Sequence, residues 1–83
     1  MFALGICYKY GDMVERNYDM AMMYFKLAIQ LNNRNAKTEL GVMYELGYGV
    51  EENKNYAYEL YISAAKQGSP YAMMQCNYAN VNY

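Results

Sequence analysis

Histidine and tryptophan are absent from this chain of 83 residues, and only one proline occurs. Without histidine, the chain lacks the side chain that most often acts as a general base or binds a metal. The aliphatic hydroxyls are limited to Thr38, Ser63 and Ser69, and none of them has a base at a spacing that would activate it. We therefore predict a protein that is not an enzyme and that has no catalytic residues, no cofactor and no metal site.

The chain also lacks an excess of either charge and any long apolar run. Seven basic residues balance eight acidic ones, so we expect no basic surface for nucleic acid or for an anionic membrane. The apolar runs are far shorter than the ~20 residues of a membrane-spanning helix. The N-terminus lacks the basic segment and the cleavage site of a signal peptide. These features favour a cytoplasmic protein with no nucleic acid and no membrane among its partners.

Cysteine is scarce. Cys7 and Cys76 lie far apart in the sequence and form no C-x-x-C pair. Two reduced thiols agree with a cytoplasmic protein, and the sequence leaves open whether the two cysteines form a disulfide.

What the chain does contain is an internal repeat. When the sequence is shifted by 36 residues against itself, ten positions are identical, where ordinary composition would give about three. The identical pairs are Leu4/Leu40, Gly5/Gly41, Tyr8/Tyr44, Gly11/Gly47, Val14/Val50, Glu15/Glu51, Asn17/Asn53, Ala21/Ala57, Ala28/Ala64 and Ala36/Ala72. A period of roughly 20 to 50 residues is typical of stacked supersecondary units. The sequence therefore predicts an array of like units.

Each unit is predicted to consist of two helices. Leu4 and Tyr8, like Leu40 and Tyr44, are four residues apart and therefore share one face of a helix. In the second helix of each unit, small and aromatic residues recur at spacings of four and three and form a single stripe. The stripe contains Ala21, Phe25 and Ala28 in the first unit and Ala57, Tyr61 and Ala64 in the second.

Glycine occurs inside the first helix of each unit. Gly5 and Gly41 lie within helical patterns, where glycine costs about 1 kcal/mol relative to alanine. Because this cost recurs at the same place in both units, we expect a packing reason. The paired helix is predicted to approach closely, with Ala21 and Ala57 opposite the two glycines.

The second helix of the first unit also has a second apolar side. A helix that is apolar on two sides is expected to be covered on both, as inside a stack. The residues of this second side are Met20, Tyr24, Leu27 and Leu31.

The connections carry residues that end and begin helices. Gly47 and Gly49 are predicted to end a helix and turn the chain, and Asn53 and Asn55 are candidates for capping the next helix. Met13 takes the place of Gly49 in the first unit, so we expect that loop to be built differently. Further along, the segment GSP at residues 68–70 supplies a stop, an N-cap and a first-turn proline.

The whole pattern, A-x3-LG-x2-Y-x2-G-x-GV…A-x3-Y-x2-A, is similar to the Sel-one-like repeat, a relative of the tetratricopeptide repeat. The match is close in the second unit and looser in the first. The resemblance implies an all-α fold, an α-α superhelix or solenoid of helical hairpins, with two repeats of 36 residues and the first helix of a third. We predict a single domain over residues 1–83, with repeat 1 at about 1–35, repeat 2 at about 36–71 and a partial repeat 3 at about 72–83.

The resemblance also implies a function. Proteins with such repeats act mostly as scaffolds or adaptors, so we predict a module that binds a protein, as a peptide or a helix, on the concave face of a short solenoid. If the first helix of each hairpin lines that face, periodicity selects the residues that contact the partner. The predicted contact residues are Phe2, Lys9, Tyr10, Thr38, Val42, Glu45, Leu46, Tyr71, Met74 and Tyr78.

Two other functions stay open at this point. Open apolar ends would allow self-assembly, or would make the chain a fragment of a longer repeat protein. A divergent enzyme or an enzyme inhibitor is a hypothesis of a different class, and the missing histidine argues against the enzyme.

Overall fold

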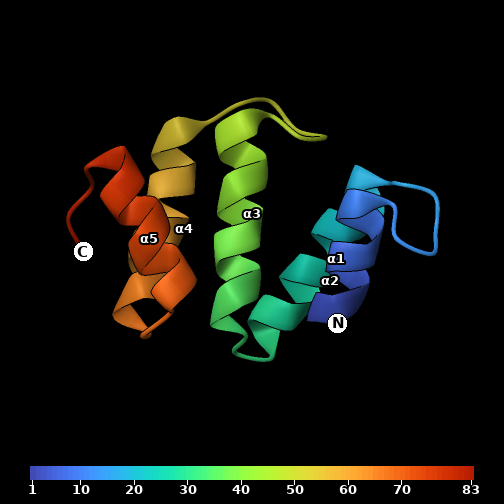
Figure 1. Ribbon diagram of the computed structural model, residues 1–83, viewed down its shortest axis with the longest axis horizontal. Helices are drawn as coiled ribbons and strands as arrows, with labels where there is room; N and C mark the ends of the chain where they lie inside the picture. Colours follow the sequence, from blue (N-terminus) through green and yellow to red (C-terminus); the bar gives the residue numbers. More distant parts are fainter.

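The computed structural model describes all residues, 1–83, as five α-helices joined by loops, without a strand (Figure 1). The helices are α1 (Phe2–Tyr10), α2 (Tyr18–Gln30), α3 (Arg34–Leu46), α4 (Lys54–Lys66) and α5 (Pro70–Ala79). Each helix packs against the next one along the chain, and α3 also contacts α5. The predicted all-α stack of two hairpins and one further helix is confirmed.

Side chains next to the helix starts explain where four of the helices begin. In each case a side-chain oxygen accepts a hydrogen bond from the backbone N–H three residues later, which satisfies a group that the helix leaves free. The capping residues are Asn17, Asn33, Asn53 and Ser69, at 3.1, 3.0, 3.1 and 3.2 Å. Of the two asparagines predicted to cap α4, Asn53 is the cap, and Asn55 lies inside the helix. Pro70 occupies the first turn of α5, as predicted.

The loop between α1 and α2 has the same backbone conformation as the loop between α3 and α4. Gly11 and Gly47 end their helices in the left-handed region, at φ values of 70° and 71°. Two residues later, Met13 has a φ of 66° and Gly49 a φ of 75°. The expectation that Met13 builds a different loop is therefore wrong, because the methionine adopts the left-handed conformation that glycine adopts more easily.

The helices of each hairpin approach closely at a glycine, as predicted, but the residue opposite is aromatic. A Cβ atom on Gly5 would lie 2.5 Å from Cε1 of Phe25, and one on Gly41 would lie 2.7 Å from Cε1 of Tyr61. The Ala57 carbonyl oxygen would be 3.2 Å from the latter Cβ. The nearest atoms to both glycines therefore belong to aromatic rings, which occupy the space that the missing side chain leaves, and Ala57 lies opposite Gly41 as expected.

Two clusters of buried residues form the core, and each joins a hairpin to the helix that follows it. The first cluster contains Ala21, Phe25 and Ala28 of α2 together with Ala36 and Met43 of α3. The second contains Ala57, Tyr61, Ala64 and Ala65 of α4 together with Ala72 and Cys76 of α5. The repeating stripe of the second helices therefore packs both within its hairpin and against the next one.

The second apolar side of α2 is only partly covered. Met20 and Tyr24 are half-buried, but Leu27 is exposed and Leu31 is 70% exposed. The expectation of a helix covered on two sides is therefore wrong for the C-terminal half of α2, because α3 and α1 pack on other faces of this helix.

Candidate interaction surface

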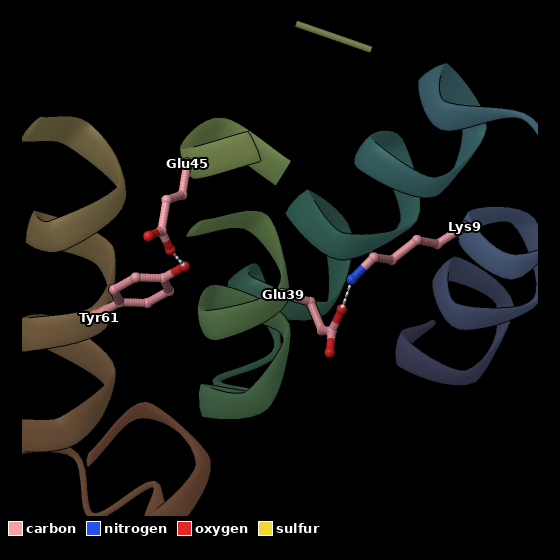
Figure 2. A network of polar contacts seen from close by, with 4 residues as sticks. All are labelled: Lys9, Glu39, Glu45 and Tyr61. Atoms are coloured by element: carbon pink, nitrogen blue, oxygen red, sulfur yellow. Dashed lines mark hydrogen bonds and ion pairs between the residues drawn. The ribbon is translucent and has the colours of Figure 1, made fainter. Parts of the chain in front are cut away.

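The first helices of the three units form one surface, which we call the first-helix face: α1, α3 and α5. Two of these helices are joined by an ion pair, in which Nζ of Lys9 on α1 lies 2.6 Å from Oε2 of Glu39 on α3 (Figure 2). The Glu39 carboxylate also raises the pKa of the Tyr71 hydroxyl on α5, a helix that contacts α3. Glu39 therefore bonds to α1 and influences the acidity of a side chain on α5.

The ion pair is almost completely shielded from water. The side chains of Lys9 and Glu39 are 4% and 6% exposed, and no buried side-chain nitrogen or oxygen in the chain lacks a hydrogen-bond partner. Nζ of Lys9 also lies 5.0 Å from the centre of the Tyr10 ring, a distance at which a cation is attracted to an aromatic face. The Lys9 end of the pair thus lies beside the tyrosine that follows it on α1.

The surroundings of Tyr71 change its acidity. Burial raises the pKa of the Tyr71 hydroxyl most, and the nearby Glu39 carboxylate raises it further, because both disfavour the phenolate. Tyr10 makes the smallest contribution to the raised pKa of Tyr71. Tyr71 therefore remains a neutral phenol at physiological pH and can act as a hydrogen-bond donor.

The ten residues predicted to contact a partner differ in exposure. Four of them are exposed, four are half-buried and two are buried. The exposed residues are Tyr10, Leu46, Met74 and Tyr78; the half-buried ones are Phe2, Val42, Glu45 and Tyr71; the buried ones are Lys9 and Thr38. The exposed four come from all three helices of the first-helix face.

The two buried residues offer almost no surface to a partner, which corrects the prediction of direct contact for them. Thr38 is 0% exposed, and its hydroxyl donates to the backbone oxygen of Arg34 at 3.3 Å. Lys9 turns inward because Glu39 lies within reach of its long side chain. Periodicity assigned both residues to the right helices, but it could not show where the side chains end.

Three of the half-buried residues are engaged inside the molecule. Phe2 packs against Phe25, with 6.0 Å between ring centres, and Val42 packs against the second core cluster. The Glu45 carboxylate accepts a hydrogen bond of 2.6 Å from the Tyr61 hydroxyl on α4 (Figure 2). Burial and this carboxylate both raise the pKa of Tyr61. These contacts reduce the surface that the three residues present.

Glu39 was not found from the sequence. It lies 30 residues after Lys9 rather than one repeat period, so the alignment of the two units does not bring the two residues together. One signal was available: Glu39 falls next to Met43 on a helix face that is otherwise apolar, and such a charge usually has a partner.

The two hollows in the surface lie at loops, away from the predicted contact residues. One has a volume of about 450 Å³ and is lined by Asn32, Asn33, Arg34, Asn35 and Gln67. The other has a volume of about 420 Å³ and is lined by Tyr44, Val50, Glu51, Glu52 and Asn53. Neither contains a residue of the ten.

Few groups in the structure could support other chemistry. No three side chains among cysteine, aspartate and glutamate come together to hold a metal ion. Both cysteines are free, and burial raises the pKa of the Cys76 thiol, which makes the reactive thiolate rarer. None of the five helices has both the length and the apolar character of a membrane-spanning segment.

Comparison with known proteins gives consistent matches. A family model described as Sel1 repeat matches residues 1–33 and residues 35–69. A putative sel1-like repeat-containing protein from Acanthamoeba polyphaga mimivirus is 36% identical over 66 residues, which are 80% of this chain and 12% of the viral protein. The crystal structure of a Sel1 repeat protein from Oxalobacter formigenes matches with a TM-score of 0.82 at 28% identity. That match covers 86% of this chain and 29% of the bacterial one, so the chain spans less than a third of either relative.

Proposed function

Because the chain belongs to the Sel1 repeat family, as its sequence pattern indicated, we propose that it is a non-catalytic adaptor that binds a peptide or helix of another protein. Sel1 repeats are generally protein-interaction scaffolds. The proposed binding site is the first-helix face.

One observation carries the choice of this face. Tyr10, Leu46, Met74 and Tyr78 are large, exposed side chains that come from three successive first helices. The nearby charges of Lys9 and Glu39 neutralise each other below the surface. Exposed aromatic and aliphatic groups on a rigid surface are the usual anchors of a protein partner, and the pairing of Lys9 with Glu39 leaves no free charge from these two residues to oppose apolar anchors on that partner.

The experiment uses a defined probe. Random peptides displayed on phage are selected on the intact protein, and the dissociation constant of the best peptide is measured by calorimetry. We expect Tyr10→Ala and Leu46→Ala each to weaken binding by about tenfold or more, because truncation of a central anchor has effects of this size.

The matched control is Leu31→Ala, which removes an exposed leucine at the C-cap of α2, outside the first-helix face. Binding by this variant should equal that of the unchanged protein. If Tyr10→Ala and Leu46→Ala both bind the selected peptide as tightly as Leu31→Ala does, the first-helix face is not the binding site.

The end of the stack supports a second candidate function, self-assembly. Leu4 on α1 is 44% exposed, whereas Leu40 at the matching place on α3 is 3% exposed. The relatives are several times longer than this chain, which is consistent with another hairpin covering Leu4. We therefore propose that the open side of α1 and α2 associates with a further hairpin, either from a second copy or from a longer array. Sedimentation at several concentrations tests the former, and a monomer at all concentrations would contradict it.

A further inference from the structure

The ion pair between Lys9 and Glu39 is not a product of the repeat. The residue that matches Lys9 in the second unit is Glu45, and the residue that matches Glu39 in the third is Gln75. The junction between α3 and α5 therefore has no such pair, and Glu45 instead accepts a hydrogen bond from Tyr61 within its own hairpin. A feature that occurs at only one of two equivalent junctions requires a local explanation.

We propose that Lys9 and Glu39 are positioning residues, which hold Tyr10 and Tyr71 in the orientation that a bound peptide requires. This inference rests on the proposed function of the first-helix face.

The geometry connects Lys9 directly to Tyr10, and Glu39 lies on α3, which contacts the helix that carries Tyr71. Nζ of Lys9 lies over the Tyr10 ring at 5.0 Å, and the Glu39 carboxylate interacts with the Tyr71 side chain. Since Lys9 and Glu39 bond to each other at 2.6 Å, Lys9, Glu39 and Tyr10 form a continuous cluster, and the Glu39 carboxylate is near enough to Tyr71 to raise the pKa of its hydroxyl. Fixing the pair therefore restricts the rotamers of both tyrosines, which lowers the entropy that binding has to remove.

Burial separates positioning from direct contact. The side chains of Lys9 and Glu39 are 4% and 6% exposed, so a peptide on the surface can touch little of either one. Tyr10 is exposed and Tyr71 is half-buried, so both present a surface to it. Any effect of the ion pair on peptide binding must therefore result from its effect on Tyr10 and Tyr71.

Stability alone does not account for the pair. Removing two charges from water is costly, and replacing a buried ion pair by apolar residues of similar size is often neutral or stabilising. A role in holding one arrangement of neighbouring side chains explains why two charges occupy a site that two apolar residues could fill.

The test uses the double variant Lys9→Met with Glu39→Leu, which removes both charges and retains side-chain volume. We expect its melting temperature to stay within a few degrees of the unchanged protein. We expect its affinity for the phage-selected peptide to fall by about tenfold, a loss of about 1.4 kcal/mol.

Nuclear magnetic resonance of the protein without peptide provides the second measurement. The χ1 couplings of Tyr10 and Tyr71 should indicate one rotamer in the unchanged protein and averaging between rotamers in the double variant. Tyr48, whose ring stacks on that of Tyr18 with 5.3 Å between the ring centres, is the internal control and should not change. A purely stabilising role would leave all three side chains in one rotamer.

The outcomes distinguish this inference from the proposed function. If Tyr10 and Tyr71 each keep one rotamer in the double variant, or if peptide affinity is unchanged while Tyr10→Ala weakens it, the positioning role is wrong. If Tyr10→Ala leaves peptide affinity unchanged, the proposed function fails, and the couplings alone decide the positioning role. Should the double variant not fold, a second double variant, Lys9→Met with Glu39→Gln, which also leaves no unpaired charge and retains the shape of the Glu39 side chain, is subjected to both measurements with the same expected results.

Discussion

In the first hairpin Leu4 is 44% exposed, whereas Leu40, which holds the same place in the second hairpin, is 3% exposed. Leu40 lies between Ala36 and Met43 on one face of α3, and these two residues belong to the core cluster of the first hairpin. In this structure α1 has no helix on the corresponding side. The repeat therefore fixes the place of a side chain, and the neighbouring hairpin determines whether that place is buried.

Polar contacts differ between the two hairpins as well. Tyr61 and Glu45 form a hydrogen bond within the second hairpin, but the matching residues of the first are Phe25 and Lys9. Phe25 has no hydroxyl, and Lys9 bonds to Glu39 of the next hairpin instead. The first hairpin has Phe25 in place of Tyr61 and Lys9 in place of Glu45. These two differences replace a hydrogen bond within the hairpin by an ion pair with the next hairpin.

The largest expected effect tests whether the neighbouring hairpin determines how deeply the matching leucines are buried. Leu40→Ala should lower the free energy of unfolding by about 3 kcal/mol, because it leaves a cavity between two hairpins, whereas Leu4→Ala should cost less than about 1 kcal/mol. Urea unfolding of both variants measures the difference. Equal losses would mean that the exposed leucine is covered in solution, for example by a second copy of the chain.

The next effect concerns the matching loop residues Gly49 and Met13. A Cβ atom on Gly49 would lie 2.5 Å from Cβ of Tyr18 on α2 of the first hairpin, and the residue has a φ of 75°. Gly49→Ala should therefore cost about 2 kcal/mol, the sum of backbone strain and crowding. Met13→Ala should be nearly neutral, because Met13 is 95% exposed. Thermal unfolding measures both variants. Equal melting temperatures for Gly49→Ala and Met13→Ala would contradict the expected difference between the two loop positions.

Features that depend on a few consecutive residues could be predicted from the sequence. The cap at Asn53 and the start of α5 at Ser69 and Pro70 were found because the side chain acts on a backbone group three residues away. The repeat and its stripe of small and aromatic residues were found for the same reason, since helical spacing is local. The fold followed from these local features.

Features that depend on another helix could not be predicted in the same way. Lys9 was placed on the surface because periodicity describes the start of a side chain, and its end reaches Glu39 on another helix. Leu31 was expected to be covered, but no hairpin lies over it. The sequence therefore predicted which helices carry the exposed residues of the candidate site, and the buried pair of Lys9 and Glu39 was missed.

A smaller effect tests the bond that only the second hairpin has. Tyr61→Phe should lower the free energy of unfolding by about 1 kcal/mol, because it removes a hydrogen bond to a carboxylate that stays partly hydrated. Phe25, which has no hydroxyl, is the natural comparison. Urea unfolding at neutral pH measures the loss, and an unchanged midpoint would mean that water replaces the bond without cost.

Tyr61 also makes the stability of the protein depend on pH at alkaline values. Burial and the Glu45 carboxylate raise the pKa of Tyr61 above 10.0, its ordinary value. The unfolded chain therefore loses this proton first, so the contribution of Tyr61 to stability is complete below pH 10 and declines as the pH rises further. In Tyr61→Phe the alkaline decline should be shallower, though not absent, because the pKa of Tyr71 is raised too.

The smallest effect returns to the loop of the first hairpin and has the opposite sign. Met13 has a φ of 66°, which strains a residue with a Cβ atom by about 1–2 kcal/mol. Glycine relieves this strain but adds freedom to the unfolded chain worth about 0.4–1 kcal/mol, so Met13→Gly should stabilise the protein by about 0.5–1 kcal/mol. An unchanged or lower melting temperature would mean that the exposed methionine makes contacts in solution that offset the strain. Glycine is required at Gly49 by the helix packed against it, and at Met13 the absence of such a helix leaves room for a side chain at a modest cost.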